Sequence, residues 1–177
     1  KSYSRITPPQ TIGKMGTFQG NFGVLVRAYT YIRLLGNSGV SQISEDAVIN
    51  ANYILSRLKG TYDLPYNRNC MHEVVLSAKN LKRAYGVTAL DVAKRLIDYG
   101  IHPPTMYFPL IVEEALMIEP TETENLETLD HFIEVMSLIS KEAKDNPNLL
   151  HEAPHDTPNT RLNEALAARS PDLRWKP

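Results

Sequence analysis

Apolar residues recur at steps of three and four from Phe22 to Leu35, which predicts one buried face of a helix. The run Gly36–Gly39 (GNSG) predicts the end of that helix. A second helix is expected over residues 41–59, closed by Gly60. The apolar faces are Phe22, Leu25, Val26, Tyr29, Ile32 and Leu35 in the first helix, and Ile43, Ala47, Ala51, Ile54, Leu55 and Leu58 in the second.

The pattern then changes to short compact runs. Residues 72–78 (HEVVLSA) are rich in β-branched residues and predict a strand, and residues 113–118 are a second strand candidate. Between them, residues 101–109 hold three prolines and cannot be helical.

Two further helices have recognisable starts. Thr88 with Asp91 has the spacing of a capping box and opens a helix that Gly100 ends. Thr121 with Glu124 has the same spacing and predicts a helix ending near Lys144. After this helix we expect an irregular tail that contains a short helix over residues 160–169. Helices around a small sheet predict an α+β fold, with the helices covering one face of the sheet.

Composition limits the class of protein. The 177 residues, 42% hydrophobic and 22% charged, suit one globular domain or one and a part. No run approaches the ~20 apolar residues of a membrane span, so no membrane partner is expected. The single Cys70 excludes an internal disulfide, and a reducing cytoplasmic setting is the simplest interpretation.

The net charge of −1 hides an uneven distribution. Residues 1–95 hold 13 Lys and Arg against 5 Asp and Glu, a charge of +8, and residues 96–177 hold 6 against 15, a charge of −9. Such a chain folds its halves together, offers them to outside partners, or simply has a solvated acidic face. Nucleic acid is not an expected partner, because the balance is slightly acidic and no aromatic-basic motif occurs.

Familiar catalytic motifs are missing. There is no phosphate loop and no H-E-x-x-H, and no metal site is expected. Cys70 with His72 two residues away is a conceivable nucleophile pair, although cysteines beside strands are mostly packing residues.

Two segments place polar groups on constrained backbone. Gly20 and Asn21 open a helix, whose free N–H groups suit an anion, although Asn21 could equally be an ordinary N-cap. In the loop from His102 to Pro109, proline-rich backbone holds histidine, threonine and tyrosine in fixed positions, as binding sites require, although a buried loop with satisfied hydrogen bonds fits equally well.

Long phrases of the sequence resemble glycine dehydrogenase (decarboxylating), the P-protein family of the glycine cleavage system. The phrases that carry the resemblance are Gly20–Gly36, Asn50–Tyr53, His72-Glu73, Ala89–Leu96, Asp98–Pro109 (DYGIHPPTMYFP) and Glu119–Glu124 (EPTETE). The tail from Thr157 to Trp175 is similar to the end of the second subunit of the bacterial two-subunit form.

The resemblance implies a pyridoxal-phosphate (PLP) enzyme with the fold-type I aspartate-aminotransferase fold, of which this chain is the small C-terminal domain. In that family glycine forms a Schiff base with PLP and loses carbon dioxide, and the aminomethyl group passes to the lipoyl arm of H-protein. The implied partners are glycine, H-protein and subunit 1, in a heterotetramer.

One feature of the family is missing. Its cofactor lysine follows a histidine and precedes a glycine-rich run, but none of the nine lysines here follows a histidine. The start at Lys1 therefore suggests a C-terminal fragment that is inactive alone. Its expected parts are a lead-in (1–20), a helical connection from the missing large domain (21–60), the α+β small domain (61–144) and a tail (145–177).

The resemblance also suggests roles for the two polar segments. His102 is expected to be a polar partner near the glycine site or the lipoyl channel, Thr105 a hydrogen bonder there, and Tyr107 a weaker candidate. Gly20 and Asn21 are expected to face the cofactor phosphate.

Two other interpretations stay open. The chain could be a non-catalytic interaction domain whose oppositely charged halves dock a protein. It could also be the small domain of another fold-type I PLP enzyme, which the long phrase from His102 to Glu124 disfavours.

Overall fold

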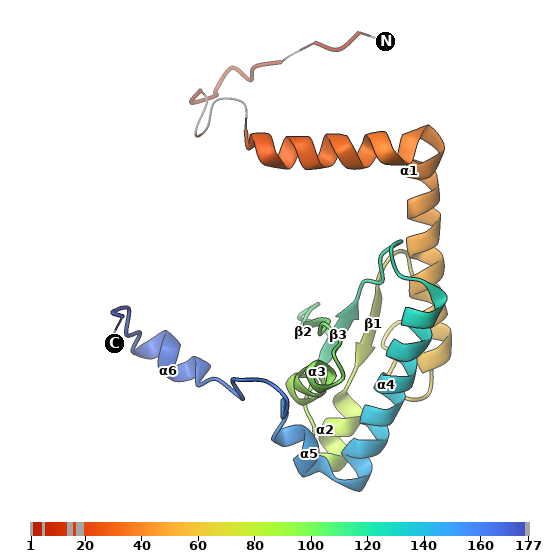
Figure 1. Cartoon of the computed structure of the whole chain (residues 1–177), viewed down its shortest axis with the longest axis vertical. Helices are drawn as coiled ribbons and strands as arrows, with labels where there is room; N and C mark the ends of the chain where they lie inside the picture. The colour runs from red at the N-terminus through yellow and green to blue at the C-terminus, as the bar shows by residue number, and fades with distance from the viewer. Residues whose placement is uncertain (1, 5, 14–15, 17–19, 176–177) are drawn as a thin grey trace. The chain divides into compact units, whose positions relative to one another are not determined.

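The computed structural model describes residues 2–4, 6–13, 16 and 20–175, which form two compact units, residues 1–42 and residues 43–177. Helix α1 (Phe22–Leu58) begins in the first unit and ends in the second. The second unit holds all the other helices and strands of the described residues (Figure 1). No helix in these described ranges is both long and apolar enough to cross a membrane.

Helix α1 is interrupted at Gly36, whose φ of 66° and ψ of −170° only glycine adopts readily. The sequence predicted a break over residues 36–39, and the structure confines it to Gly36, after which the helix resumes. The predicted burial of the first helix face is wrong, because Phe22 is 79% and Tyr29 66% exposed. A helix buries its apolar face only against a second layer, and residues 1–42 supply none among those described.

The sheet has three antiparallel strands in the order β1-β3-β2, which confirms the predicted α+β class. Strand β1 (Val74–Ser77) and the two-residue β2 (Thr105–Met106) both pair with the central β3 (Ala115–Ile118). In the register, Val74 lies opposite Ile118 and Thr105 opposite Met117. Both predicted strands therefore exist, shortened at their ends.

Alternation along these strands gives the sheet two different faces. Val74, Leu76, Leu116 and Ile118 point into the core, where they join apolar residues of α1, α3 (Ala89–Asp98) and α4 (Leu126–Asp145). The opposite face carries Val75, Thr105 and Met117, which are half-buried or exposed. The helices thus bury one face of the sheet and leave part of the other accessible.

The two capping predictions had different outcomes. Thr88 and Asp91 form the predicted capping box at the start of α3. Thr121 and Glu124 do not cap α4; they form a turn in which the Glu124 N–H donates to the Thr121 carbonyl. Asn125 caps α4 instead, accepting from the Thr128 N–H at 2.9 Å, because asparagine is a preferred N-cap.

Three short helices complete the second unit: α2 (Lys79–Tyr85), α5 (Pro147–His151) and α6 (Glu164–Arg169). Helices α2 and α5 pack against α4 (Figure 1). Helix α6 lies within the short helix predicted over residues 160–169. Sequence patterns did not predict α2 and α5, whose short segments show no clear helical periodicity. The expected loose tail is wrong for its first part, since Leu150 and Ala153 are fully buried.

A nearly buried ionic cluster joins α3, α4 and the segment after α5. The guanidinium of Arg95 donates to both carboxylate oxygens of Glu142 at 2.9 Å and to Asp98 at 3.1 Å. The other Asp98 oxygen accepts from the main-chain N–H groups of His155 and Asp156. The cluster thus makes one unit of three chain segments that are far apart in the sequence.

Electrostatics within the cluster favour the ionised carboxylates. Burial opposes the ionisation of Glu142, but hydrogen bonds from Arg95 and Tyr99 and the charge of Arg95 outweigh it, so the pKa of this carboxyl lies below its usual range. The pKa of Asp98 is also lowered, since hydrogen bonds from His155, Asp156 and Arg95 outweigh burial.

Replacing Glu142 with glutamine should lower the free energy of unfolding at pH 7 by about 2 kcal/mol, the loss of hydrogen bonds to a charged group. A lowered folded-state pKa stabilises above the unfolded value of about 4.3, and this contribution disappears as pH falls through the folded value. Urea unfolding should therefore show a difference between the parent chain and E142Q that shrinks between about pH 5 and pH 3. Glu134→Gln, on the exposed side of the same helix, is the control and should change stability by less than about 0.5 kcal/mol. A difference that is equal at all pH values would contradict this account.

Candidate functional site

The proline-rich loop after α3 presents the polar residues that the sequence singled out. Gly100, with φ 71°, follows the end of α3, and residues 101–104 lead to β2 at the edge of the sheet. The main-chain N–H of Tyr107 donates to the Ala115 carbonyl at 2.9 Å. Pairing with β3 therefore fixes the backbone that carries Thr105 and Tyr107.

A cavity of about 470 Å³ lies beside this loop and is lined by residues of the loop, the end of β3 and helix α4. The polar side chains in its wall are His102, Thr105, Glu119, Glu124, Thr128 and His131. Among the described residues that line it there is no Lys or Arg. The cavity thus suits neutral or cationic groups and donors, rather than an isolated anion.

The structure brings together two of the five predicted site residues. His102 and Thr105 both line the cavity, whereas Tyr107 does not and is 43% exposed. Gly20 and Asn21 belong to the unit 1–42. There the Asn21 side-chain oxygen accepts from the Val24 N–H at 3.2 Å, as an ordinary N-cap does.

A second polar group forms where β1 begins and β3 ends. The potential ligand atoms of His72, Glu73 and Glu119 all lie within 4.8 Å of one another. The pairing of Val74 with Ile118, continued by one residue, places Glu73 opposite Glu119. Sequence analysis missed this group because only the strand register reveals that residues 72–73 meet residue 119.

Asparagines of α1 hold both chain segments of this second group. Asn50 donates to the carbonyls of Thr121 and Glu124 at 3.0 and 3.3 Å. Asn52 accepts from the Cys70 N–H at 3.0 Å and donates to the Cys70 carbonyl at 2.8 Å. The segments on either side of the group are therefore fixed to the same helix.

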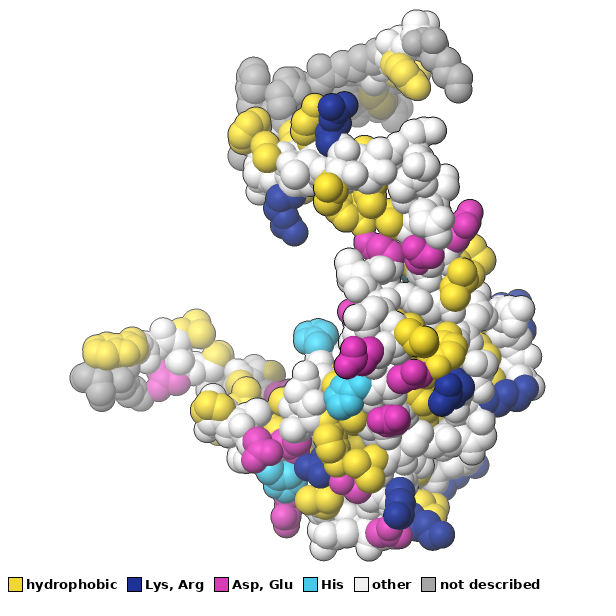
Figure 2. All heavy atoms as spheres, turned by 45° about the vertical axis from the view of Figure 1, so that its right-hand side comes forward, with side chains coloured by type: hydrophobic (Ala, Val, Ile, Leu, Met, Phe, Trp, Pro, Cys, Tyr) yellow, Lys and Arg dark blue, Asp and Glu magenta, His cyan; other side chains and the backbone are white. Residues whose placement is uncertain are grey.

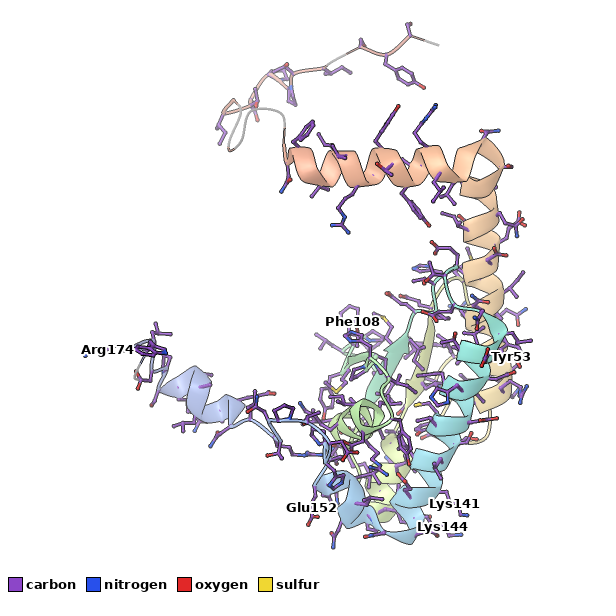
Figure 3. The ribbon with its side chains drawn as sticks, viewed as in Figure 1. Tyr53, Phe108, Lys141, Lys144, Glu152 and Arg174 are labelled. Atoms are coloured by element: carbon purple, nitrogen blue, oxygen red, sulfur yellow. The ribbon has the colours of Figure 1, made fainter. Side chains whose placement is uncertain are left out.

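Tyr53, the next residue of this phrase, fixes the helix itself. Its hydroxyl donates to Asp130 and accepts from Arg57, which ties α1 to α4 (Figure 3). The side chains of the segment Asn50–Tyr53 thus connect α1 by hydrogen bonds to both walls of the site.

Acidic side chains and histidines gather on the same part of the second unit (Figure 2). This agrees with the sequence, in which residues 96–140 contain no Lys or Arg. The negative half of the chain therefore contributes much of the surface near the cavity.

A family model described as the C-terminal domain of glycine dehydrogenase matches residues 43–159. The chain belongs to this family. The match includes the cavity, His102, Thr105 and the His72 group, and it confirms the resemblance found in the sequence.

Individual relatives support the same family assignment. A probable glycine dehydrogenase (decarboxylating) subunit 2 from Lysinibacillus sphaericus is 59% identical over 168 residues, 95% of this chain and 34% of the relative. The protein of the same name from Thermotoga maritima is 53% identical over 174 residues, 98% of this chain and 37% of the relative. The chain spans about a third of the length of the curated relatives that it matches.

The surroundings of Cys70 favour the neutral thiol over the thiolate. Burial raises the pKa of the Cys70 thiol and the negative charge of Glu73 raises it further, against the opposing effect of a backbone hydrogen bond. Catalytic cysteines have a lowered pKa and a cationic neighbour, so the electrostatics here are the reverse.

The pH dependence of thiol modification tests this description of Cys70. In the folded chain, the rate of reaction with a disulfide reagent should rise with a midpoint above the value of about 8.5 for a free cysteine. Glu73→Gln should lower that midpoint because it removes a negative charge, whereas Glu127→Gln on α4 should not. A midpoint below that of free cysteine would contradict the description.

Proposed function

We propose that this chain is the C-terminal part of subunit 2 of a two-subunit glycine dehydrogenase (decarboxylating). The parent enzyme, assembled with subunit 1 in a cytoplasmic heterotetramer, would decarboxylate glycine and transfer the aminomethyl group to the lipoyl arm of H-protein. The observation that carries the proposal is the match over 95% of the chain to proteins named as that subunit. The same match disfavours the small domain of an unrelated PLP enzyme.

The fold-type I assignment follows from this proposal. In it, the α+β small domain expected over residues 61–144 closes against a large, cofactor-bearing domain. The small antiparallel sheet with helices on one face supports the assignment. The accessible face, which carries Thr105 and Met117, would then be the one turned toward the active site.

The described residues that line the His102 cavity do not by themselves fit pyridoxal phosphate. The cofactor needs a lysine amine for its aldehyde and cations or N–H groups for its phosphate. The described lining of the His102 cavity offers neither a Lys nor an Arg. When bound in the parent enzyme, the cofactor supplies the electron sink for decarboxylation, and residues outside this chain would hold it.

This chain's own contribution is then to bind and orient. His102 is a donor or acceptor at the mouth of the loop, and Thr105 is a hydroxyl fixed on β2, both exposed at the cavity. Stiff proline backbone on one side and strand pairing on the other limit how far these groups move. Tyr107 is a weaker candidate, because it does not line this cavity. Gly20 and Asn21 belong to the other unit, and a contact of theirs with the cofactor phosphate in the parent enzyme stays a prediction.

The first test uses the chain alone. Mixed with pyridoxal phosphate and treated with borohydride, the 177-residue chain should form no stoichiometric adduct at a single lysine, as measured by mass spectrometry. A full-length subunit 2 is the positive control. One specific, saturating adduct on this chain would contradict the proposal that residues outside this chain hold the cofactor.

The second test uses the complete two-subunit enzyme. His102→Ala should lower kcat/KM for glycine by about 10- to 100-fold, the loss of one hydrogen bond to a charged group. Leu110→Ala, an 86% exposed position in the same loop region, is the control and should leave the rate unchanged. Unchanged glycine exchange and unchanged H-protein-dependent turnover in H102A would overturn the role given to His102.

A further inference from the structure

The group formed by His72, Glu73 and Glu119 has the composition of a metal site. One imidazole and two carboxylates offer three ligand atoms within 4.8 Å of one another. Glu73 is half-buried, and His72 and Glu119 are exposed, so an ion from solvent can reach all three. Zinc sites with an open position use three protein ligands of these types and one water.

The two carboxylates lie opposite each other, just beyond the paired strands. Like charges directly opposite each other on neighbouring strands destabilise a sheet. Glu73 and Glu119 occupy such positions, one step beyond the pair Val74 and Ile118. No Lys or Arg in the described residues forms an ion pair with either of them, whereas Glu113 and Glu114 near the other end of the sheet are paired with Lys79 and Lys82.

The backbone around the group is held in place from outside it. Asn52 makes two hydrogen bonds to the main chain of Cys70, two residues before His72. Asn50 holds the carbonyls of Thr121 and Glu124, just after Glu119. Because both asparagines come from α1, the two ligand-bearing segments keep their separation, and only the side chains need to turn toward an ion.

The group also lies between two neighbouring cavities. Glu119 lines the 470 Å³ cavity, and His72 and Glu73 line a neighbouring one of about 590 Å³. Met117 lines both. An ion here would keep positions open to water or to a ligand entering from either side.

We propose that His72, Glu73 and Glu119 form a binding site for one divalent transition-metal ion of the Zn²⁺ type. The imidazole selects against Mg²⁺ and Ca²⁺, which prefer all-oxygen sites. The ion offsets the repulsion between the two carboxylates and joins the start of β1 to the end of β3. This site does not depend on the function proposed above, since binding and folding report on it directly.

Calorimetric titration of the metal-free 177-residue chain with Zn²⁺ tests the site. The expected result is one ion per chain, with at least tenfold weaker binding in both His72→Ala and Glu119→Gln. Millimolar Mg²⁺ should not displace the ion. Zn²⁺ should raise the Tm of the parent chain by more than that of either variant. Without metal, H72A should have the Tm of the parent chain, and E119Q the same Tm or a slightly higher one, because it removes one of the two opposed carboxylates.

The matched controls are His131→Ala and Glu134→Gln, a histidine and a glutamate exposed on α4. They should bind Zn²⁺ as the parent chain does. Weaker binding in H131A but not in H72A would place the ion on α4 and overturn the proposal. Absence of saturable binding, several equivalent ions per chain, or equal affinity for Mg²⁺ would also overturn it.

Discussion

The pairing of β3 with both of its neighbours is the constraint on which the second unit depends. Since side chains alternate along a strand, the register that sends Leu116 and Ile118 into the core sends Met117 and Glu119 to the other face. A slip of one residue would exchange the two sets and bury a carboxylate. The apolar core and the polar cavity wall are therefore two results of the same register.

Buried charge ties the helices to this strand at its other end. Glu114, just before β3, is 5% exposed and adopts φ 52°. Its carboxylate accepts from the Lys82 ammonium at 2.6 Å and from the Ala89 N–H at 2.7 Å, so it joins α2 and the start of α3 to β3. A buried carboxylate is tolerated only with such partners, which makes this junction specific in geometry.

The sequence predicted those features that depend on interactions between residues close together in the chain. The capping box at Thr88, the stop at Gly100 and the β-branched run 72–78 each act within a few residues, and the structure contains all three features. His102 and Thr105 could be singled out as candidates for the same reason, because a proline-rich loop can be recognised without its neighbours, and both residues line the cavity.

The remaining features depend on contacts distant in the sequence. Whether Phe22 is buried depends on a second layer, and whether Asn125 or Thr121 caps α4 depends partly on Asn50 holding the turn. The proximity of Glu73 and Glu119 follows only from strand register, which no motif encodes.

The segment after α5 has a practical consequence for handling the protein. Arg161 donates to the carbonyls of Leu150 and Ala153 and pairs at 2.7 Å with Asp91, the residue that completes the capping box of α3. A protease that cut beyond Arg161 would release side chains that are exposed throughout residues 162–175, whereas a cut just after α4 would detach part of the core. A piece that keeps this core and the ion pair at the start of α3 therefore extends through Arg161, well past the last long helix.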